Sequence, residues 1–78
     1  MFQNARTIKI FVELLDEGTP TMRGTQAIDL GNGLYEVLPT PDYDPEDEVW
    51  EFLPGSVVML EKRVGYPGEY LLAVAKHE

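Results

Sequence analysis

Residues 28–38 read Ile-Asp-Leu-Gly-Asn-Gly-Leu-Tyr-Glu-Val-Leu, and this stretch contains the clearest structural signal in the chain. Asn32 and Gly33 stand between two apolar runs, and both residue types tolerate the positive φ angles that a tight hairpin turn requires. An Asn-Gly pair with such flanks is the strongest short-range hairpin signal. The sequence therefore predicts two antiparallel strands joined at this point.

Two extended segments are predicted ahead of this hairpin. Residues 7–16 alternate with a period of two, which is typical of a half-buried strand, and their apolar side consists of Ile8, Ile10, Val12 and Leu14. After a polar break with Gly and Pro, residues 21–30 form a second extended stretch, with one side formed by Met22, Ile28 and Leu30. Gly24 interrupts this stretch and predicts a bulge or bend.

Three prolines follow the hairpin between residues 39 and 45. Each removes a backbone donor and restricts the residue before it, so regular structure is not expected before Val49. One short helical turn at most is predicted near residues 45–49, because Asp44 can cap it and proline is favoured at the first helical position.

The C-terminal part predicts a final hairpin. Residues 56–64 are rich in Val, Met and Leu and are typical of a strand, and residues 65–68, Gly-Tyr-Pro-Gly, predict a turn. Residues 69–76 then supply the partner strand. Together with segments 7–16, 21–30 and 34–38, these two strands give five short strands and no convincing amphipathic helix.

Short strands separated by turns about every eight to twelve residues favour a small closed β-structure. We predict an all-β fold, a five-stranded antiparallel barrel of the SH3-like type, because closure removes the exposed edges of a flat sheet. An OB-like barrel and a strongly bent open sheet are the alternatives. A chain of 78 residues makes a single domain, residues 1–78, in which residues 1–6 and 77–78 are expected to be flexible.

Fourteen acidic residues against six basic ones give a net charge of -8. Such a charge repels nucleic-acid backbones and anionic lipid surfaces, so direct binding to nucleic acid or to a membrane is not expected. The same field attracts a basic protein surface, including that of a nucleic-acid-binding protein. The plainer interpretation of the acidity is solubility alone.

Two further features concern the setting of the protein. It contains no cysteine, which excludes disulfides and thiolate metal sites. Residues 1–6 lack the apolar run of a signal peptide, and no apolar segment reaches the length of a membrane span, so a cytoplasmic protein is predicted. A monomer is expected, or a weak homodimer formed through an exposed strand edge.

The segment from Asp42 to Glu51 interleaves carboxylates with aromatic rings, and a second acidic pair follows the first strand. Aromatic rings supply contact area while carboxylates pair with Lys or Arg, so this composition predicts a protein-docking surface. The predicted partner-binding residues are Asp16, Glu17, Asp42, Tyr43, Asp44, Glu46, Asp47, Glu48, Trp50 and Glu51. For Trp50 and Phe52 the alternative is burial in the core, because they alternate along an extended segment.

The same segment begins like a calcium loop, with oxygen donors at Asp42, Asp44 and Glu46. A twelve-residue calcium loop needs glycine at its sixth position and glutamate at its twelfth, where this chain has Asp47 and Leu53. The motif fails at both positions, so neither a metal site nor a cofactor is predicted. A divalent-cation or small-ligand module remains the alternative function.

Catalytic chemistry has little support in the sequence. The single histidine, His77, is the penultimate residue, where chains usually fray and hold a general base poorly. Ser56 lacks a nucleophile-elbow motif. Paired carboxylates are plentiful, but a chain this short seldom forms the cleft that would set their spacing. We therefore expect a protein that is not an enzyme.

Four motifs and one arginine are spread over residues 14–74: Leu-Leu-Asp-Glu-Gly-Thr at 14–19, Arg23, Asp-Pro-Glu-Asp-Glu-Val-Trp-Glu-Phe at 44–52, Pro-Gly-Ser-Val-Val at 54–58 and Leu-Leu-Ala-Val at 71–74. Together they resemble a group of short, uncharacterised bacterial proteins of no known function. Those relatives tend to have tryptophan just before the arginine, where this chain has Met22. The resemblance implies a bacterial or phage origin and no particular chemistry.

The function predicted from these observations is a non-catalytic interaction module that presents an acidic-aromatic face to a basic protein surface. In scale and charge it is similar to inhibitor or immunity proteins, and its sharpest form is a nucleic-acid mimic whose carboxylates take the places of phosphates. Binding of proline-rich peptides suits the acids and aromatics, but the tyrosine-rich first strand of that SH3 class is not found in residues 7–11.

Overall fold

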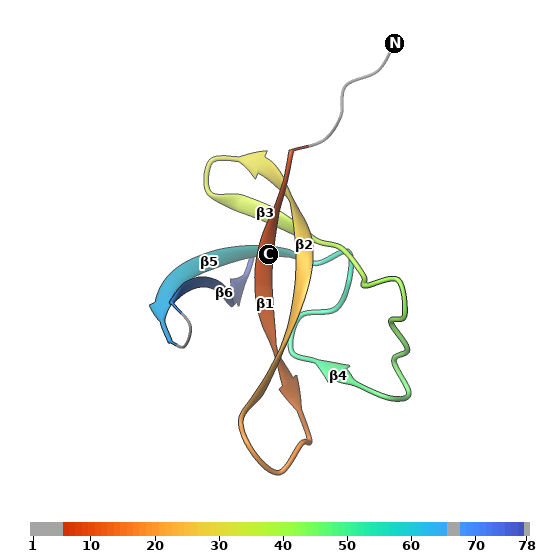
Figure 1. Ribbon diagram of the computed structural model, residues 1–78. Coiled ribbons are helices and arrows are strands. Elements are labelled where there is room, and N and C mark those ends of the chain that lie inside the picture. Colours follow the sequence, from red (N-terminus) through yellow and green to blue (C-terminus); the bar gives the residue numbers. More distant parts are fainter. Residues whose placement is uncertain (1–5, 66–67, 78) are drawn as a thin grey trace.

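The computed structural model describes residues 6–65 and 68–77, and in these ranges the chain is all-β and contains no helix (Figure 1). The all-β prediction is therefore confirmed. One sheet holds the strands in the order β2-β3-β5-β6-β1-β4, and β1 pairs in addition with β2. The six strands are β1 (Thr7–Leu15), β2 (Thr21–Gly31), β3 (Leu34–Val37), β4 (Val49–Trp50), β5 (Val57–Val64) and β6 (Glu69–Lys76).

Backbone pairing runs as a ring through five of the strands. The pairs β1–β2, β2–β3, β3–β5 and β5–β6 are antiparallel, and β6 returns to β1 in parallel at Leu72 and Phe11. The purely antiparallel sheet predicted from the sequence is thus wrong, and the reason is geometric. Strand direction alternates around an antiparallel ring, so with five strands the first and last run the same way and can meet only in parallel.

The predicted hairpin connects β2 to β3 through Asn32 and Gly33. Both residues have positive φ angles, 58° and 77°, and Gly31 before them has 88°. Gly31 pairs with Leu34 across the turn, and a register shift between Asp29 and Gly31 places a bulge just ahead of it. The Asp29 carboxylate accepts a hydrogen bond from the Gly31 N–H at 2.9 Å, which stabilises this backbone. The hairpin prediction is confirmed.

The side of β2 that faces the core carries the smaller residues of this strand. Thr25 and Ala27 are buried, whereas Met22 and Leu30 are 40% and 48% exposed, contrary to the apolar pattern of residues 21–30. The Thr25 hydroxyl donates to the Leu38 carbonyl at 2.6 Å, so this buried polar group has a partner. Small inner side chains on β2 leave volume for large aromatic rings from elsewhere in the chain.

The bulge predicted at Gly24 is not found, because β1 and β2 pair without a register shift. Gly24 lies opposite Phe11, and a Cβ atom there would come within 2.6 Å of Lys9 Cε and 3.2 Å of Phe11 Cε2. The missing side chain therefore makes room for Lys9 and Phe11 to lie across β2. Phe11 also packs edge-to-face against Tyr70 of β6, with 5.5 Å between the ring centres.

One helical turn interrupts the long connection between β3 and β4. The Asp44 carbonyl accepts hydrogen bonds from the Asp47 and Glu48 N–H groups at 2.9 and 3.1 Å. The Asp44 carboxylate caps the Glu46 N–H at 2.9 Å. Asp44 thus acts as the cap that the sequence predicts, but the chain leaves the turn after these bonds and does not continue as a helix.

Val49 and Trp50 form β4, which the prediction of five strands missed. Trp50 pairs with Leu14 and Val49 with Leu15, at the C-terminal end of β1. Two residues are too few to produce a periodic signal in the sequence. Because neighbouring strand residues face opposite ways, Trp50 is buried while Val49 remains 41% exposed.

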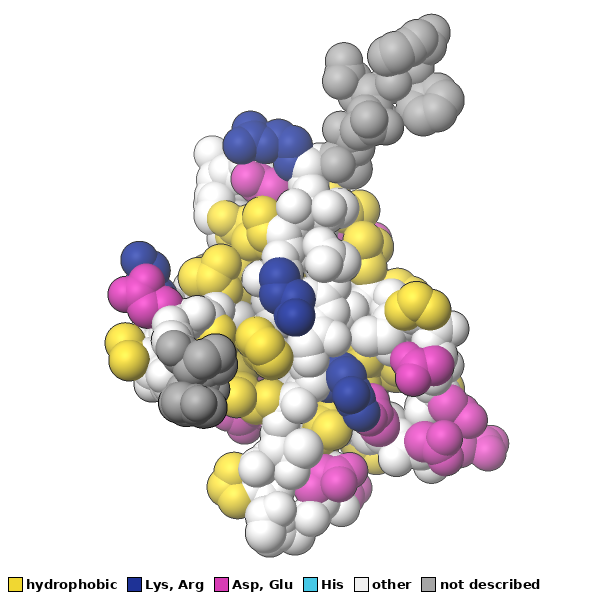
Figure 2. All heavy atoms as spheres, in the orientation of Figure 1, with side chains coloured by type: hydrophobic (Ala, Val, Ile, Leu, Met, Phe, Trp, Pro, Cys, Tyr) yellow, Lys and Arg dark blue, Asp and Glu magenta, His cyan; other side chains and the backbone are white. Residues whose placement is uncertain are grey.

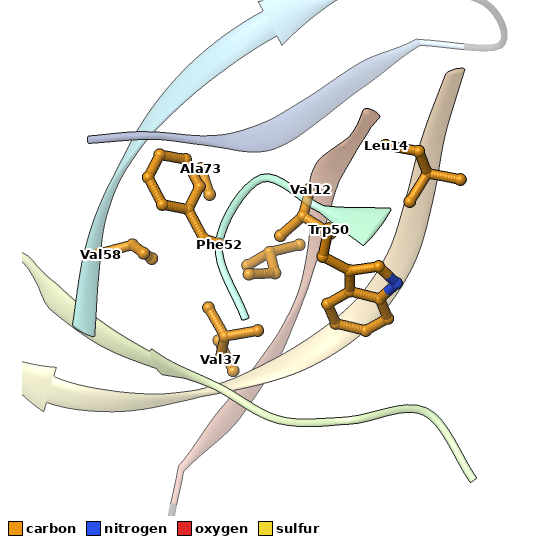
Figure 3. Close-up of a cluster of buried hydrophobic side chains, with 9 residues drawn as sticks. Val12, Leu14, Val37, Trp50, Phe52, Val58 and Ala73 are labelled. Carbon is orange, nitrogen blue, oxygen red and sulfur yellow. The ribbon is translucent and has the colours of Figure 1, made fainter. Parts of the chain in front are cut away.

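A cluster of nine buried side chains forms the core inside the ring of strands (Figure 3), and Leu72 of β6 is buried outside this cluster. Figure 3 shows the Trp50 ring beside Leu14, and the Phe52 ring near Val58 and Ala73. Trp50 is 2% and Phe52 9% exposed, so the alternative in which both are core residues is the correct one. The buried members are Ile10, Val12, Leu14, Ala27, Val37, Trp50, Phe52, Val58 and Ala73.

The pairing of the first and last strands extends by one hydrogen bond beyond each strand, before the start of β1 and after the end of β6. The Arg6 carbonyl accepts from the Asp29 N–H at 2.8 Å, and the His77 N–H donates to the Val57 carbonyl at 2.8 Å. Arg6 and His77 each gain one backbone bond in this way, and the predicted flexibility of residues 1–6 and 77–78 stays a prediction. The remaining flexible-end predictions and the middle of the predicted last turn lie outside the described residues, at positions 1–5, 66–67 and 78.

Replacement of Ile10 by Ala is expected to lower the free energy of unfolding by about 2–5 kcal/mol, because it empties a fully buried site. Leu53→Ala is the matched control, since Leu53 is 54% exposed and its loss should change stability by less than about 0.5 kcal/mol. Urea denaturation measures both. Equal effects of the two substitutions would contradict the assigned core.

Candidate functional site: an acidic surface

The charge of the protein is concentrated in two segments of the sequence. Residues 13–17 and 42–51 contain nine of the fourteen carboxylates and no Lys or Arg. Setting Arg23 aside, the other five bases are balanced by the other five acids, so these two segments and Arg23 account for the whole net charge of -8. We call the nine carboxylates the acidic surface: Glu13, Asp16, Glu17, Asp42, Asp44, Glu46, Asp47, Glu48 and Glu51.

Strand pairing between β1 and β4 brings the two segments together. The ladder continues past β4, because the Glu51 N–H donates to the Glu13 carbonyl at 2.8 Å. Figure 2 shows Asp and Glu side chains gathered over the β3–β4 connection and the turn between β1 and β2, with Lys and Arg mainly over other parts of the molecule. Burial, and then repulsion from Glu13, raise the pKa of the Glu51 carboxyl. The carboxylates are therefore close enough to interact.

Arg23 of β2 connects this strand to the acidic segment through Glu48. Its Nε donates to Glu48 Oε1 at 3.2 Å, and its Nη2 makes an ion pair with Glu48 Oε2. Glu48 Oε1 also accepts the Trp50 indole N–H at 3.0 Å. These bonds, that from Arg23 first, lower the pKa of the Glu48 carboxyl. The hydrogen bond to Glu48, and then the nearby charges of Glu48, Asp42 and Glu17, raise the pKa of Arg23.

Glu48 thus has a structural task within the acidic surface. Its carboxylate accepts the indole N–H of Trp50, whose ring fills the core. Without this partner the buried N–H would cost about 1–3 kcal/mol. Arg23 keeps 47% of its side chain exposed, so its ion pair with Glu48 contributes at most about 1 kcal/mol. The network positions the β3–β4 connection against β2 more than it stabilises the fold.

The structure places the predicted partner-binding residues in three environments. The exposed ones are Asp16, Glu17, Asp42, Asp44, Glu46, Asp47 and Glu51, while Glu48 is half-buried in its network with Arg23. Tyr43 is half-buried and packs edge-to-face on Trp50, with 4.8 Å between ring centres. Trp50 itself is in the core and offers no ring to a partner, so we leave it out of the surface.

Sequence reasoning did not include several residues that share this surface. Glu13 and Arg23 belong to it through strand pairing and the Glu48 network, and Leu15, Met22 and Val49 expose apolar side chains beside it. Glu13 and Leu15 lie on the outward side of the alternating first strand, which was a usable signal. The position of Val49 depends on β4, which has no sequence signal of its own.

Within the described residues, the structure contains no group of three or more side chains placed to hold a metal ion, and no cavity or pocket. In that part of the chain, no helix has the length and apolar character needed to cross a membrane. Comparison with protein-family models, curated proteins and solved structures finds no match. The resemblance to short bacterial proteins therefore stays a prediction.

Glu48→Gln is expected to lower the free energy of unfolding at pH 7 by about 1 kcal/mol, because the amide keeps an acceptor for Trp50 but loses the charge that Arg23 contacts. Glu51→Gln should act in the opposite direction, because it removes one of two repelling carboxylates. Chemical denaturation at neutral pH measures both. Two variants that shift stability the same way would contradict this assignment.

Both effects are expected to shrink in acid. The folded pKa of Glu48 is depressed, so its stabilising contribution is complete above the unfolded pKa and is lost as pH falls through the folded pKa. The folded pKa of Glu51 is raised, so its destabilising contribution at neutral pH disappears as pH falls through that value. Denaturation at pH 3 should therefore bring both variants toward the wild-type protein, and undiminished differences would exclude charge as the cause.

Proposed function

We propose that this protein is a non-catalytic interaction module whose acidic surface binds a basic surface on another protein. The observation that carries the proposal is the location of the net charge, which belongs to two segments that the β1–β4 pairing joins. A protein that used acidity for solubility alone could spread its carboxylates evenly. A concentrated negative field accelerates encounters with a cationic partner and sets the orientation of approach.

The partner that fits this field is a protein with an exposed cluster of Arg or Lys. Proteins that bind DNA or RNA carry such clusters, so an inhibitor or immunity-type role, or mimicry of nucleic acid, belongs to the same proposal. In that case duplex DNA should compete for the partner. The rival proposal of a divalent-cation module has no observation in its favour among the described residues.

We also propose that the ring of five strands closes as an SH3-like barrel. The proposal is supported by the antiparallel order of β1, β2, β3, β5 and β6 and by the return of β6 to β1. Closure would hold the C-terminal half of β1 rigid, and with it the edge on which β4 presents the acidic surface. An open, strongly bent sheet would leave the β1–β6 contact weak.

Amide hydrogen exchange tests this closure. If the ring is closed, the amides of β6 next to Phe11 should exchange about as slowly as those of the β1–β2 ladder, because both report global unfolding. Fast exchange confined to this part of β6, with slow exchange in β1 and β2, would favour the open sheet.

A pair of charge-reversal variants tests the binding proposal. Glu46→Lys/Asp47→Lys reverses two exposed carboxylates of the acidic surface and leaves Asp44 and Glu48, which have structural bonds, in place. Glu61→Lys/Glu69→Lys makes the same change in net charge on the β5–β6 hairpin. We expect the first pair to abolish capture of basic proteins from a bacterial lysate, and the second pair to retain it.

Salt and circular dichroism complete the experiment. Capture by the unaltered protein should weaken steeply between about 50 and 300 mM salt, because exposed charges are screened over about 10 Å at 0.1 M. Both variants should remain folded, since all four substituted side chains are exposed and the ion pairs that Glu61 and Glu69 make with Arg63 and Lys62 are surface pairs that contribute at most about 1 kcal/mol each. Identical retention of basic proteins by both variants would leave solubility as the role of the acidity.

A further inference from the structure

Strand register places five side chains on the outward side of β2, β1 and β4. Glu13 pairs with Met22 on one side and lies beside Glu51 on the other, and Leu15 pairs with Val49 in the next row. Side chains directly opposite on such a sheet are about 5 Å apart, and diagonal neighbours about 7–8 Å. We call these five residues the outer face: Glu13, Leu15, Met22, Val49 and Glu51.

The apolar part of the outer face is open. Leu15, Val49 and Met22 are 42%, 41% and 40% exposed, although two of them form a direct cross-strand pair. Isolated exposed apolar side chains are ordinary, but neighbouring ones on a sheet surface indicate a contact site. Covering them with another apolar side chain would contribute about 25 cal/mol for each Å² removed from water.

The acidic part of the outer face is unbalanced. Glu13 and Glu51 are like charges in adjacent strand positions, an arrangement that disfavours the sheet. None of the ion pairs within the described residues includes either of them. Those pairs are Arg23 with Glu48, Lys62 with Glu69 and Arg63 with Glu61. Arg63 is close enough to interact weakly with Glu13, yet its hydrogen bond goes to Glu61. A cation from another molecule would relieve this repulsion.

We propose that the outer face binds an extended segment of the partner in which a large aliphatic residue lies two positions from an arginine or lysine, so that both side chains face the same way. The cation lies between Glu13 and Glu51, and the aliphatic side chain covers Leu15 and Val49. Arginine suits the cation position between Glu13 and Glu51 best, because its planar guanidinium can bond to two carboxylates while its stem covers apolar surface. This inference rests on the proposed function and specifies the chemistry of the partner.

The charge of the face selects this occupant over a second copy of the chain. A second copy docked symmetrically would bring Glu13 and Glu51 against the same residues, and the repulsion would oppose the apolar contact. Charge alone is not sufficient either, because exposed ion pairs contribute about 0–1 kcal/mol each. The apolar pair supplies the part of the affinity that salt does not screen.

Two short peptides with the same charge test the inference. Both contain three arginines; in one, each arginine is followed two positions later by leucine, with serine between them, and in the other serine replaces each leucine. We expect the leucine peptide to bind about five- to tenfold more tightly in NMR titrations and to shift the amide signals of Leu15 and Val49. Equal affinities, with shifts confined to residues 42–48, would overturn the outer face while the proposed function stands.

Matched variants locate the apolar contact. Val49→Thr keeps the shape of an exposed β-branched residue and should weaken the leucine peptide about threefold without affecting the serine peptide. Val64→Thr makes the same change at a residue that is 79% exposed on the other hairpin, and should affect neither. If both valine variants behave alike, the contact site is wrong. If neither peptide binds at low salt, this inference and the proposed function both fail.

Discussion

Strand β1 takes part in three pairings, and the rest of the molecule depends on how its two edges are used. One edge pairs with β2 along nearly the whole strand. The other edge is divided, with Phe11 next to β6 and with Leu14 and Leu15 next to β4. The first half of that edge completes the ring of strands, and the second half brings in the segment that carries the carboxylates. Fold and surface charge therefore have the same backbone origin.

Concentrating negative charge in this way opposes folding, and the structure contains local features that offset it. Trp50 anchors the acidic segment by filling the core directly beside it, so apolar burial compensates for repulsion on the surface. Glu48 is tied to that ring and to Arg23, and Asp44 bonds to its own turn. The remaining carboxylates of the surface are left to solvent. The acidic surface is thus divided into carboxylates with structural bonds and carboxylates that face solvent alone.

Much of this architecture could be predicted from local patterns, and the errors have a common physical cause. The alternation of residues 7–16 and the Asn32–Gly33 turn act over a few residues, so they indicated the first strand and the hairpin correctly. The inward side of β2, the strand at Val49 and the parallel contact of β6 depend on partners far away in the chain. The acidic segment could be recognised from composition alone. That Glu13 and Arg23 share its surface, and that Trp50 belongs to the core, followed only from the register of β1 with its neighbours.

The parallel contact between Phe11 and Leu72 also bears on how the chain reaches this structure. Hairpins such as β2–β3 can form early because their partners are adjacent, whereas this contact joins the first strand to the last across the largest loop in the fold. Folding should accordingly be slow for so small a domain, on a scale of milliseconds to seconds, with closure among its final events. During synthesis on the ribosome, the part of this β1 edge around Phe11 must wait unpaired until β6 has emerged. Throughout that interval it is a site for misassembly with other nascent chains.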